Sequence, residues 1–374
     1  MVAGLYCEVP VAVLRAPPYD LALQDLVVAR VRATNELGPG PFSEANLAGA
    51  LVETEPAAMA GPTRGAGTGT TGIELNWAPL TSPEDGHSPV TTYALDWDAG
   101  AGTGAPWASL AGSASDYLLA SYVVTAGVSA GTAYRFRLRA ANFWGWGAYS
   151  PVATIVAATT PSQPAAPTTA VGSAAGAIEI SWAAPDSQGD PITSYLVEIQ
   201  GATPGAWTAE AAHCGGTSAV SCTVPMAVVT AAPYLLSQGD LVEVRVTAAN
   251  SYGPGPASPA NTAGADVRVA PLAMAAPIRG PATASAQVEV QWTLLAGPSD
   301  GGSPVTSYHL QWDQGTGTWA DLVGLVSPHL LAGYTVTTGV TPGTSHQFRV
   351  RAANVYGWGP YSPATAILAS QAPA

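Results

Sequence analysis

The chain has 374 residues, which is too long for one β-sandwich and suits three or four compact units. Charged residues make up only 10% of it, so the surface must consist mainly of Ser, Thr, Gly, Ala and Pro. The net charge of −13, with only 12 Lys and Arg, argues against nucleic acid or an anionic membrane as a partner, because phosphate binding needs clustered cations. Pro and polar residues interrupt every Ala-rich run, so we predict no membrane span in this segment.

The first predicted strand, Arg30–Asn35, has related copies along the whole chain. The copies end at Asn142, Asn250 and Asn354, at intervals of 107, 108 and 104 residues, and each is followed by a Gly-x-Gly turn and a Ser. The copies alternate apolar and polar residues, which is the pattern of a strand with one face in a core and the other in solvent.

The next predicted strand, Ile73–Trp77, also alternates and recurs as Ile178–Trp182 and Val288–Trp292. It has no copy before residue 57. Segments rich in Pro, Gly, Ser and Asp separate the strands and are interpreted as turns, as in 82–89 and 297–304. Such strands at regular spacing, without helical periodicity, predict an all-β chain of tandem sandwiches of about 100 residues each.

Three features recur in the complete repeats: a Trp on the second strand, a Tyr on the third, and a sixth strand of the type Tyr-x-Phe-Arg-Leu-Arg-Ala-x-Asn-x-x-Gly. The Trp and Tyr positions are Trp77, Trp182, Trp292, Tyr93, Tyr195 and Tyr308. In these features the chain resembles the fibronectin type III family over essentially its whole length. The resemblance implies immunoglobulin-like sandwiches with these six side chains in their cores. It also implies a tyrosine corner at Tyr134 alone, because Val27, Val242 and His346 stand at the equivalent positions.

The expected modules are residues 56–163, 164–271 and 272–374, preceded by residues 1–55 as the C-terminal half of a module. Modules two and four share Gly-Trp-Gly and Trp-Asp pairs, whereas modules one and three share Cys-x-Val-Pro and Gly-Pro-Gly-Pro. The repeating unit is therefore predicted to be a pair of unlike modules. Its length is 215 residues from Asn35 to Asn250, or 212 from Asn142 to Asn354.

Residues 1–50 lack the Trp and Tyr strands, so this segment is not expected to close a sandwich by itself. Either the native chain is longer, which we favour, or a neighbouring chain supplies the missing strands by β-augmentation. At the other end, Ala369–Ala374 resembles the linker that starts at Thr159 and is expected to lead into another module.

Cys214 and Cys222 lie eight residues apart in one expected module, a spacing that permits a local disulfide. Cys7 corresponds to Cys222, and a partner eight residues upstream would precede Met1. A disulfide would indicate an oxidising, extracellular setting. The alternative is three unrelated buried thiols.

The search for catalytic, metal or cofactor sites yields no constellation. The five His residues stand singly, and the acidic residues near 84–85, 186–190 and 300 lack the alternating Asp/Asn pattern of a calcium loop, so they are interpreted as turn residues. No Ser-His-Asp order, Cys-His pair or phosphate-binding Gly loop occurs. We therefore predict no enzyme, no cofactor and no metal.

Arg side chains on the sixth strand lie near Trp and Tyr residues in modules two and four. The arrangement resembles the ladder of cytokine-receptor members of the family, in which cation–π contacts stiffen the module. The residues expected to form a structural ladder that also offers an aromatic surface to a neighbour or glycan are Arg137, Arg139, Trp144, Trp146, Arg349, Arg351 and Trp358.

The predicted function is an extracellular or cell-surface structural protein that self-associates into a filament or a longer array. The main alternative is a receptor or adhesin ectodomain that binds protein or carbohydrate, and a third is a set of accessory modules of an enzyme. The cell-adhesion Arg-Gly-Asp tripeptide and the N-glycosylation sequon are both absent. The linker Thr159–Thr169 is a candidate carrier of O-linked glycans, with a plain spacer as the other interpretation.

Overall fold

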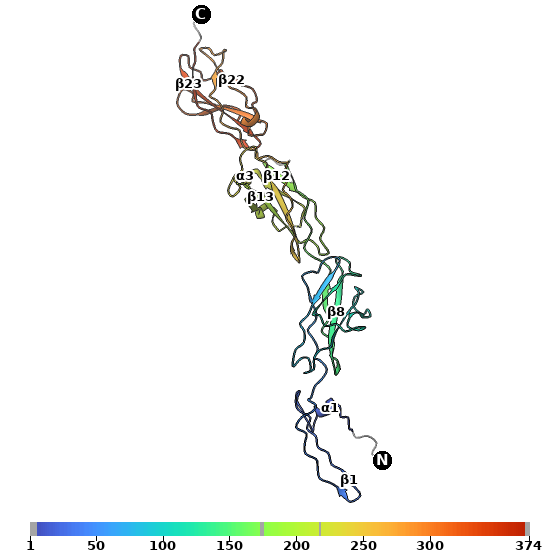
Figure 1. Ribbon diagram of the computed structural model, residues 1–374. Coiled ribbons are helices and arrows are strands. Elements are labelled where there is room, and N and C mark those ends of the chain that lie inside the picture. Colours follow the sequence, from blue (N-terminus) through green and yellow to red (C-terminus); the bar gives the residue numbers. More distant parts are fainter. Residues whose placement is uncertain (1–5, 173–175, 217, 371–374) are drawn as a thin grey trace. The chain divides into compact units, whose positions relative to one another are not determined.

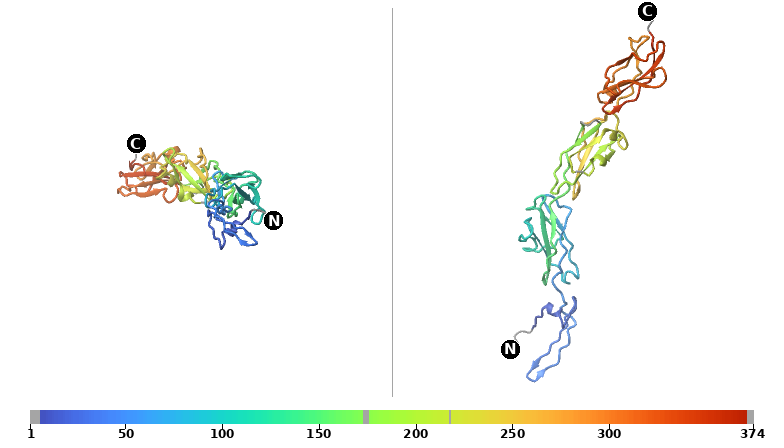
Figure 2. Two further views of the ribbon diagram at one scale, coloured as in Figure 1. Left: turned by 60° about the horizontal axis from the view of Figure 1, so that its bottom comes forward. Right: turned by 180° about the vertical axis from the view of Figure 1, so that it is seen from behind.

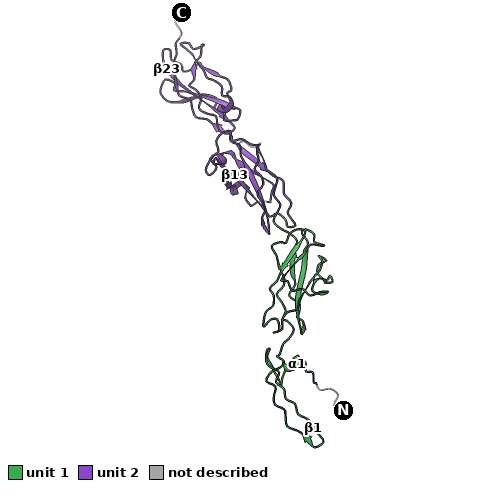
Figure 3. Cartoon of the chain, in the orientation of Figure 1, with its two compact units in different colours: residues 1–160, 188–191 green, residues 161–187, 192–374 purple. Residues whose placement is uncertain are grey.

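The computed structural model describes residues 6–172, 176–216 and 218–370. Contacts divide the chain into two compact units, residues 1–160 with 188–191 and residues 161–187 with 192–374 (Figure 3). Regular structure in the described residues is almost entirely antiparallel β-strand. Three separate hydrophobic cores form around Trp77, Trp182 and Trp292. The predicted all-β fold of tandem fibronectin type III-like sandwiches is confirmed. Residues 371–374 of the expected terminal linker lie outside the described residues.

The sandwich around Trp77 consists of two sheets. The first has the order β3-β4-β7, with β3 Thr63–Arg64, β4 Ile73–Asn76 and β7 Ser121–Val124. The second has the order β10-β8-β5-β6, with β9 also on β8; its strands are β5 Thr92–Trp97, β6 Ala108–Ala111, β8 Ala133–Asn142, β9 Gly145–Trp146 and β10 Ala153–Val156. The alternation of β4 turns Ile73 and Leu75 fully into the core, as the sequence pattern predicts.

The sandwich around Trp182 pairs the sheet β11-β12-β15 with the sheet β14-β13-β16-β17. Its strands are β11 Thr168–Val171, β12 Ala177–Ser181, β13 Ser194–Gln200, β14 Trp207–Ala209, β15 Ser221–Pro225, β16 Val244–Asn250 and β17 Gly253–Pro254. Two short helices, α2 Ala211–Cys214 and α3 Met226–Thr230, flank β15. Met226 and Val229 fix α3 to the core, because both side chains are buried.

The sandwich around Trp292 repeats the first one strand for strand. Its sheets have the orders β18-β19-β22 and β21-β20-β23-β24, with β25 also on β23. The bounds are β18 Ile278–Arg279, β19 Val288–Gln291, β20 Ser307–Trp312, β21 Ala320–Val323, β22 Gly333–Val336, β23 Ser345–Asn354, β24 Gly357–Trp358 and β25 Thr365–Leu368, with a 3-10 turn at Gly297–Asp300.

The N-terminal segment, residues 6–55, has little regular structure. It contains α1 Val11–Leu14 and a hairpin of β1 Thr34–Asn35 with β2 Gly38–Pro39, which ends two extended arms (Figures 1 and 2). None of the three cores includes a described residue of this segment. Val31 is 74% exposed, whereas its counterpart Val246 in the Trp182 sandwich is completely buried. The segment thus presents to solvent the positions that a closed sandwich buries.

The tyrosine corner forms at Tyr134. Its hydroxyl donates to the carbonyl of Gly127 at 2.9 Å and accepts from the amide of Ser129 at 2.8 Å. His346, at the equivalent position of the Trp292 sandwich, is completely buried, and neither of its ring nitrogens has a hydrogen-bond partner. The Trp292 sandwich therefore leaves buried polar atoms unsatisfied at a position where the Trp77 sandwich satisfies them.

The disulfide lies in the Trp182 sandwich and joins Cys214 at the end of α2 to Cys222 on β15. Glu210 precedes α2 and is buried; its carboxylate accepts from the Tyr234 hydroxyl at 2.6 Å and contacts the His213 ring at 2.9 Å. Cys7 is an exposed free thiol.

Candidate interaction surface

The candidate interaction surface starts from the alternation of strand β8. Tyr134, Phe136 and Leu138 point into the core of the Trp77 sandwich, with at most 2% of each residue exposed. Because side chains alternate along a strand, the intervening Arg135, Arg137 and Arg139 must stand on the outer face of the sheet. A row of guanidinium groups therefore follows from the same pattern that builds the core.

Aromatic rings alternate with these guanidinium groups. The Arg137 guanidinium carbon lies 4.4 Å from the ring centroid of Trp107 and 3.8 Å from that of Tyr149. Arg139 lies 4.4 Å from the Tyr149 centroid and 4.6 Å from that of Trp146. Five of these groups alternate as Trp, Arg, Tyr, Arg, Trp, which we call the Trp77 ladder. Arg135 also lies 5.3 Å from the Trp107 centroid. Each exposed cation–π contact of this type is worth about 0.5–1 kcal/mol.

The Trp292 sandwich has a second ladder in the same order. Arg349 lies 4.1 Å from the ring centroids of both Trp319 and Tyr361. Arg351 lies 4.3 Å from the Tyr361 centroid and 4.8 Å from that of Trp358. This arrangement, which we call the Trp292 ladder, places its cations on β23 as the first ladder does on β8.

The Trp182 sandwich has only one rung. Arg245 lies 4.6 Å from the Trp207 centroid and pairs with Glu198 at 2.7 Å. Thr247 occupies the position of the second Arg, and Pro254 stands where the other sandwiches have a Trp between two glycines. In the N-terminal segment, Arg30 and Arg32 both lie over Phe42. Among the described residues, full ladders thus occur only where the sequence has Gly-Trp-Gly.

The Trp77 ladder is held by a carboxylate on the neighbouring strand. Nη2 of Arg137 and Oδ2 of Asp96 are 3.1 Å apart, and the Tyr149 hydroxyl donates to the same oxygen at 2.7 Å. Burial, together with this hydrogen bond to a charged acceptor, raises the pKa of Tyr149 above its ordinary value. Asp96 therefore orients both the cation and the ring of one rung.

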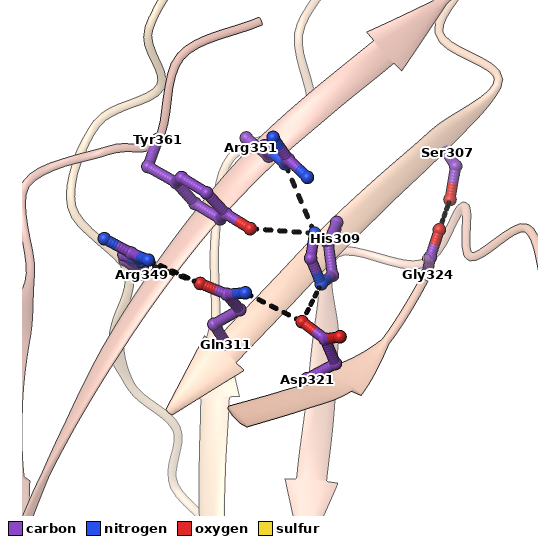
Figure 4. A network of polar contacts seen from close by, with 8 residues as sticks. All are labelled: Ser307, His309, Gln311, Asp321, Gly324, Arg349, Arg351 and Tyr361. Atoms are coloured by element: carbon purple, nitrogen blue, oxygen red, sulfur yellow. Dashed lines mark hydrogen bonds and ion pairs between the residues drawn. The ribbon is translucent and has the colours of Figure 1, made fainter. Parts of the chain in front are cut away.

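The Trp292 ladder uses different polar partners (Figure 4). Gln311 occupies the position of Asp96, and its Oε1 accepts from Nε and Nη2 of Arg349 at 2.9 and 2.7 Å. His309 replaces Ala94 and is completely buried. Its Nε2 lies 2.8 Å from Oδ1 of Asp321. Its Nδ1 accepts a hydrogen bond from Nε of Arg351 at 3.2 Å and lies 3.0 Å from the Tyr361 hydroxyl. Burial lowers the pKa of His309 below its ordinary value, although Asp321 opposes the change.

The structure brings six of the seven predicted surface residues into the two ladders: Arg137, Arg139, Trp146, Arg349, Arg351 and Trp358. Trp144 takes no part in the stacking. Its indole Nε1 donates to Oε2 of Glu53 at 2.9 Å, and its ring contacts Phe143 edge-on. Only the Trp inside the Gly-Trp-Gly motif, Trp146, packs over β8. The preceding turn residue, Trp144, points toward Glu53.

Sequence reasoning missed the terminal rungs Trp107 and Trp319. Both follow Gly-rich turns that have no periodicity, so nothing local assigns them to a strand face. A signal was present, because the two residues are 212 positions apart, the same offset that relates Asn142 to Asn354. Alignment of the two modules would have paired them.

Each ladder strand also ends in an Asn whose side chain makes hydrogen bonds to the segment that precedes its sandwich. Nδ2 of Asn142 donates to the carbonyls of Thr54 at 2.7 Å and Asp85 at 2.8 Å. Nδ2 of Asn354 makes the same pair of bonds to Val269 and Asp300. Within the second compact unit, Tyr356 of the β23–β24 turn packs against the core of the Trp182 sandwich. The ladder strands thus connect each sheet to the segment that precedes it.

The chemistry of this surface is that of stacking and charge. The Trp146 end of the Trp77 ladder is open, since this ring is 38% exposed, and Phe143 in the adjoining turn is 82% exposed. Among the described residues, no group of three or more His, Cys, Asp or Glu is placed to hold a metal ion. No helix in the described part of the chain is both long and apolar enough to cross a membrane.

Comparison with known proteins gives matches to one kind of domain. Residues 277–367 match the family model of the fibronectin type III domain. The fibronectin type-III domain-containing protein 3a of Gallus gallus is 27% identical over 301 residues, which are 78% of this chain and 22% of that protein. The Mus musculus protein 3A is 26% identical over 299 residues, with the same coverage. The chain thus spans about a fifth of the length of these curated relatives.

Among solved structures, the chicken CNTN1 FN1–FN3 domains align with 84% of this chain and 99% of that one, at 18% identity and a TM-score of 0.28. The fold assignment accordingly rests on the sheets and cores described above. These features and the family-model match agree with the resemblance expected from the Trp, Tyr and Arg-rich strands. The match identifies residues 277–367 as a fibronectin type III domain, and over 78% of its length the chain is similar to a fibronectin type-III domain-containing protein.

Proposed function

We propose that the chain is an extracellular structural segment whose modules act as building blocks of a filament or a longer cell-surface array. The observation that carries this function is the pair of ladders, each on a strand that also binds the preceding chain through Asn142 or Asn354. Cation–π stacking restrains long side chains on the sheet, and the Asn bonds restrain the linker. Both favour a stiff repeat rather than a catalyst.

The module boundaries 1–55, 56–163, 164–271 and 272–374 belong to this proposal, as does self-association. The disulfide Cys214–Cys222 supports an oxidising compartment. Candidate O-linked glycans on the linker Thr159–Thr169 are consistent with that location. The absence of a nucleophile–base or metal constellation in the sequence supports a non-enzymatic role.

A receptor or adhesin ectodomain is the second candidate. The exposed aromatic side chains Phe143, Trp144 and Trp146 favour it, because ring faces stack on apolar ligands and on sugars. The two functions differ in the state of the purified protein. An array protein forms periodic assemblies of many copies, whereas an adhesin stays a discrete particle that binds a ligand.

Negative-stain electron microscopy of the native material and of the purified chain tests the proposal. The expected result is filaments in which this chain recurs at regular intervals, and their loss in the double variant Trp146→Ala, Trp358→Ala. Val326→Ala is the control, because Val326 is an exposed apolar residue that belongs to neither ladder. Discrete, ligand-binding monomers in the native material would overturn the structural function in favour of the second candidate.

A further inference from the structure

The hydrogen bonds around His309 fix its protonation state. Nε of Arg351 can only donate, so Nδ1 of His309, 3.2 Å away, must be the acceptor and carries no proton. The Tyr361 hydroxyl, 3.0 Å from the same nitrogen, is then also a donor. The remaining proton lies on Nε2 and is donated to Oδ1 of Asp321 at 2.8 Å. The ladder as it stands requires the neutral imidazole.

We propose that His309 is a pH-sensitive latch of the Trp292 ladder, in which protonation of Nδ1 expels the Arg351 guanidinium from its place between Tyr361 and Trp358. A proton on Nδ1 would point at the Nε–H of Arg351 and place two cations in contact. The Tyr361 hydroxyl can rotate to accept from the new N–H, but a guanidinium has no acceptor atom. Arg351 is therefore the group that must move.

The charged and titratable groups that face His309 come from three places. Asp321 on β21 attracts an imidazolium, whereas Arg349 and Arg351 on β23 repel one, and Tyr361 follows β24. The ring is completely buried, so loss of hydration also disfavours its charge. The pKa of His309 is lowered from 6.5 in consequence. The neutral form of His309 therefore stabilises the ladder near neutral pH. This stabilisation is lost as the pH falls below about 6.5 and through the pKa of His309 in the folded state.

The Trp77 ladder lacks this device. Ala94 stands at the position of His309, and the polar partner of Arg137 is the carboxylate of Asp96. Acidification into the histidine range therefore leaves its stacking in place. The latch regulates one ladder only, and it does not depend on whether the chain is an array protein or an adhesin.

Indole ¹⁵N–¹H resonances of the full chain, with tryptophan labelled, provide the test. The resonance of Trp358 is expected to shift between pH 7.5 and 5, with a midpoint below 6.5, because its ring stacks on Arg351. The resonances of Trp107 and Trp146 are expected to stay constant over the same range. Similar shifts in both ladders would contradict the proposal.

Three variants separate His309 from the other buried histidine, His346, which lies against Trp312. His309→Ala reproduces the residue of the Trp77 sandwich and should abolish the shift of Trp358. Asp321→Asn keeps an acceptor for Nε2–H but removes the attracting charge, so it should move the midpoint to lower pH. If His309→Ala does not fold, Asp321→Asn still tests the proposal, because an unchanged midpoint in that variant would overturn the latch. A Trp358 shift that persists in folded His309→Ala would also overturn it. His346→Tyr should leave the midpoint unchanged.

Discussion

The Trp77 and Trp292 ladders share their rings and cations but differ in what holds them. In the first, the Asp96 carboxylate binds Arg137 and Tyr149. In the second, the neutral Gln311 binds Arg349, and the buried His309 connects Arg351, Tyr361 and Asp321. The stacking order follows from strand alternation and the Gly-Trp-Gly turn, whereas the polar support behind it is free to vary. The difference gives two modules of one design unlike responses to charge removal and to pH.

The strongest destabilisation should come from removing Arg137, which stacks between Trp107 and Tyr149, or its counterpart Arg349. Arg137→Ala leaves the nine-tenths buried carboxylate of Asp96 without its cation and should lower the free energy of unfolding of the Trp77 sandwich by about 2–3 kcal/mol. Arg349→Ala leaves only the neutral amide oxygen of Gln311 without its donor and should cost the Trp292 sandwich about 1 kcal/mol. Hydrogen exchange of β8 and β23 amides in the full chain measures the two separately. Equal losses would show that Asp96 contributes nothing specific. Arg15→Ala, which removes an exposed positive charge outside the ladders, controls for loss of charge.

The vacant tyrosine corner gives the next effect. His346→Tyr should raise the free energy of unfolding of the Trp292 sandwich by about 1–2 kcal/mol. The reason is that the hydroxyl of Tyr134, at the equivalent position, makes hydrogen bonds to two backbone groups, whereas the ring of His346 makes none. Thermal unfolding followed by amide exchange on β23 is the measurement. Tyr134→His is the reciprocal variant and should destabilise the Trp77 sandwich. A destabilised His346→Tyr would mean that the second core lacks room for the larger ring.

The terminal rungs should contribute similarly in the two ladders, because the extra contact of Trp107, with Arg135, is long at 5.3 Å. Trp107→Leu and Trp319→Leu each keep an apolar side chain and remove the ring beside Arg137 or Arg349. Each should cost about 0.5–1 kcal/mol, the usual value of an exposed cation–π contact. Urea unfolding of the two variants measures this. A clear inequality would indicate that the polar support also tunes the stacking.

Alkaline titration should not distinguish the ladders. Burial raises the pKa of both Tyr149 and Tyr361 above 10, so the protonated forms contribute stability that is present below pH 10 and lost as the pH rises further. Tyrosinate absorbance of the full chain is compared with that of Tyr149→Phe and Tyr361→Phe. The difference should show that the hydroxyls of both Tyr149 and Tyr361 titrate above pH 10. An early-titrating Tyr361 would conflict with its donor role toward His309.

The candidate surface was predictable as far as strand alternation reaches. The recurring Arg-rich strands placed Arg137, Arg139, Arg349 and Arg351 on one face, and Gly-Trp-Gly placed Trp146 and Trp358 beside them. Trp144 was assigned to the same surface because it is adjacent in sequence, but it bonds Glu53 instead. The direction of a turn side chain depends on the neighbour it meets, which no local pattern specifies.

The repeat, the strands, the three cores and the tyrosine corner could be predicted from the sequence, because each depends on a period or an internal copy. The contacts of His309 could not be predicted in this way. Its partners Asp321, Arg351 and Tyr361 lie 12, 42 and 52 residues further along the chain. Such contacts arise when antiparallel strands fix their register, and a one-residue slip would send every one of these side chains to the other face of the sheet.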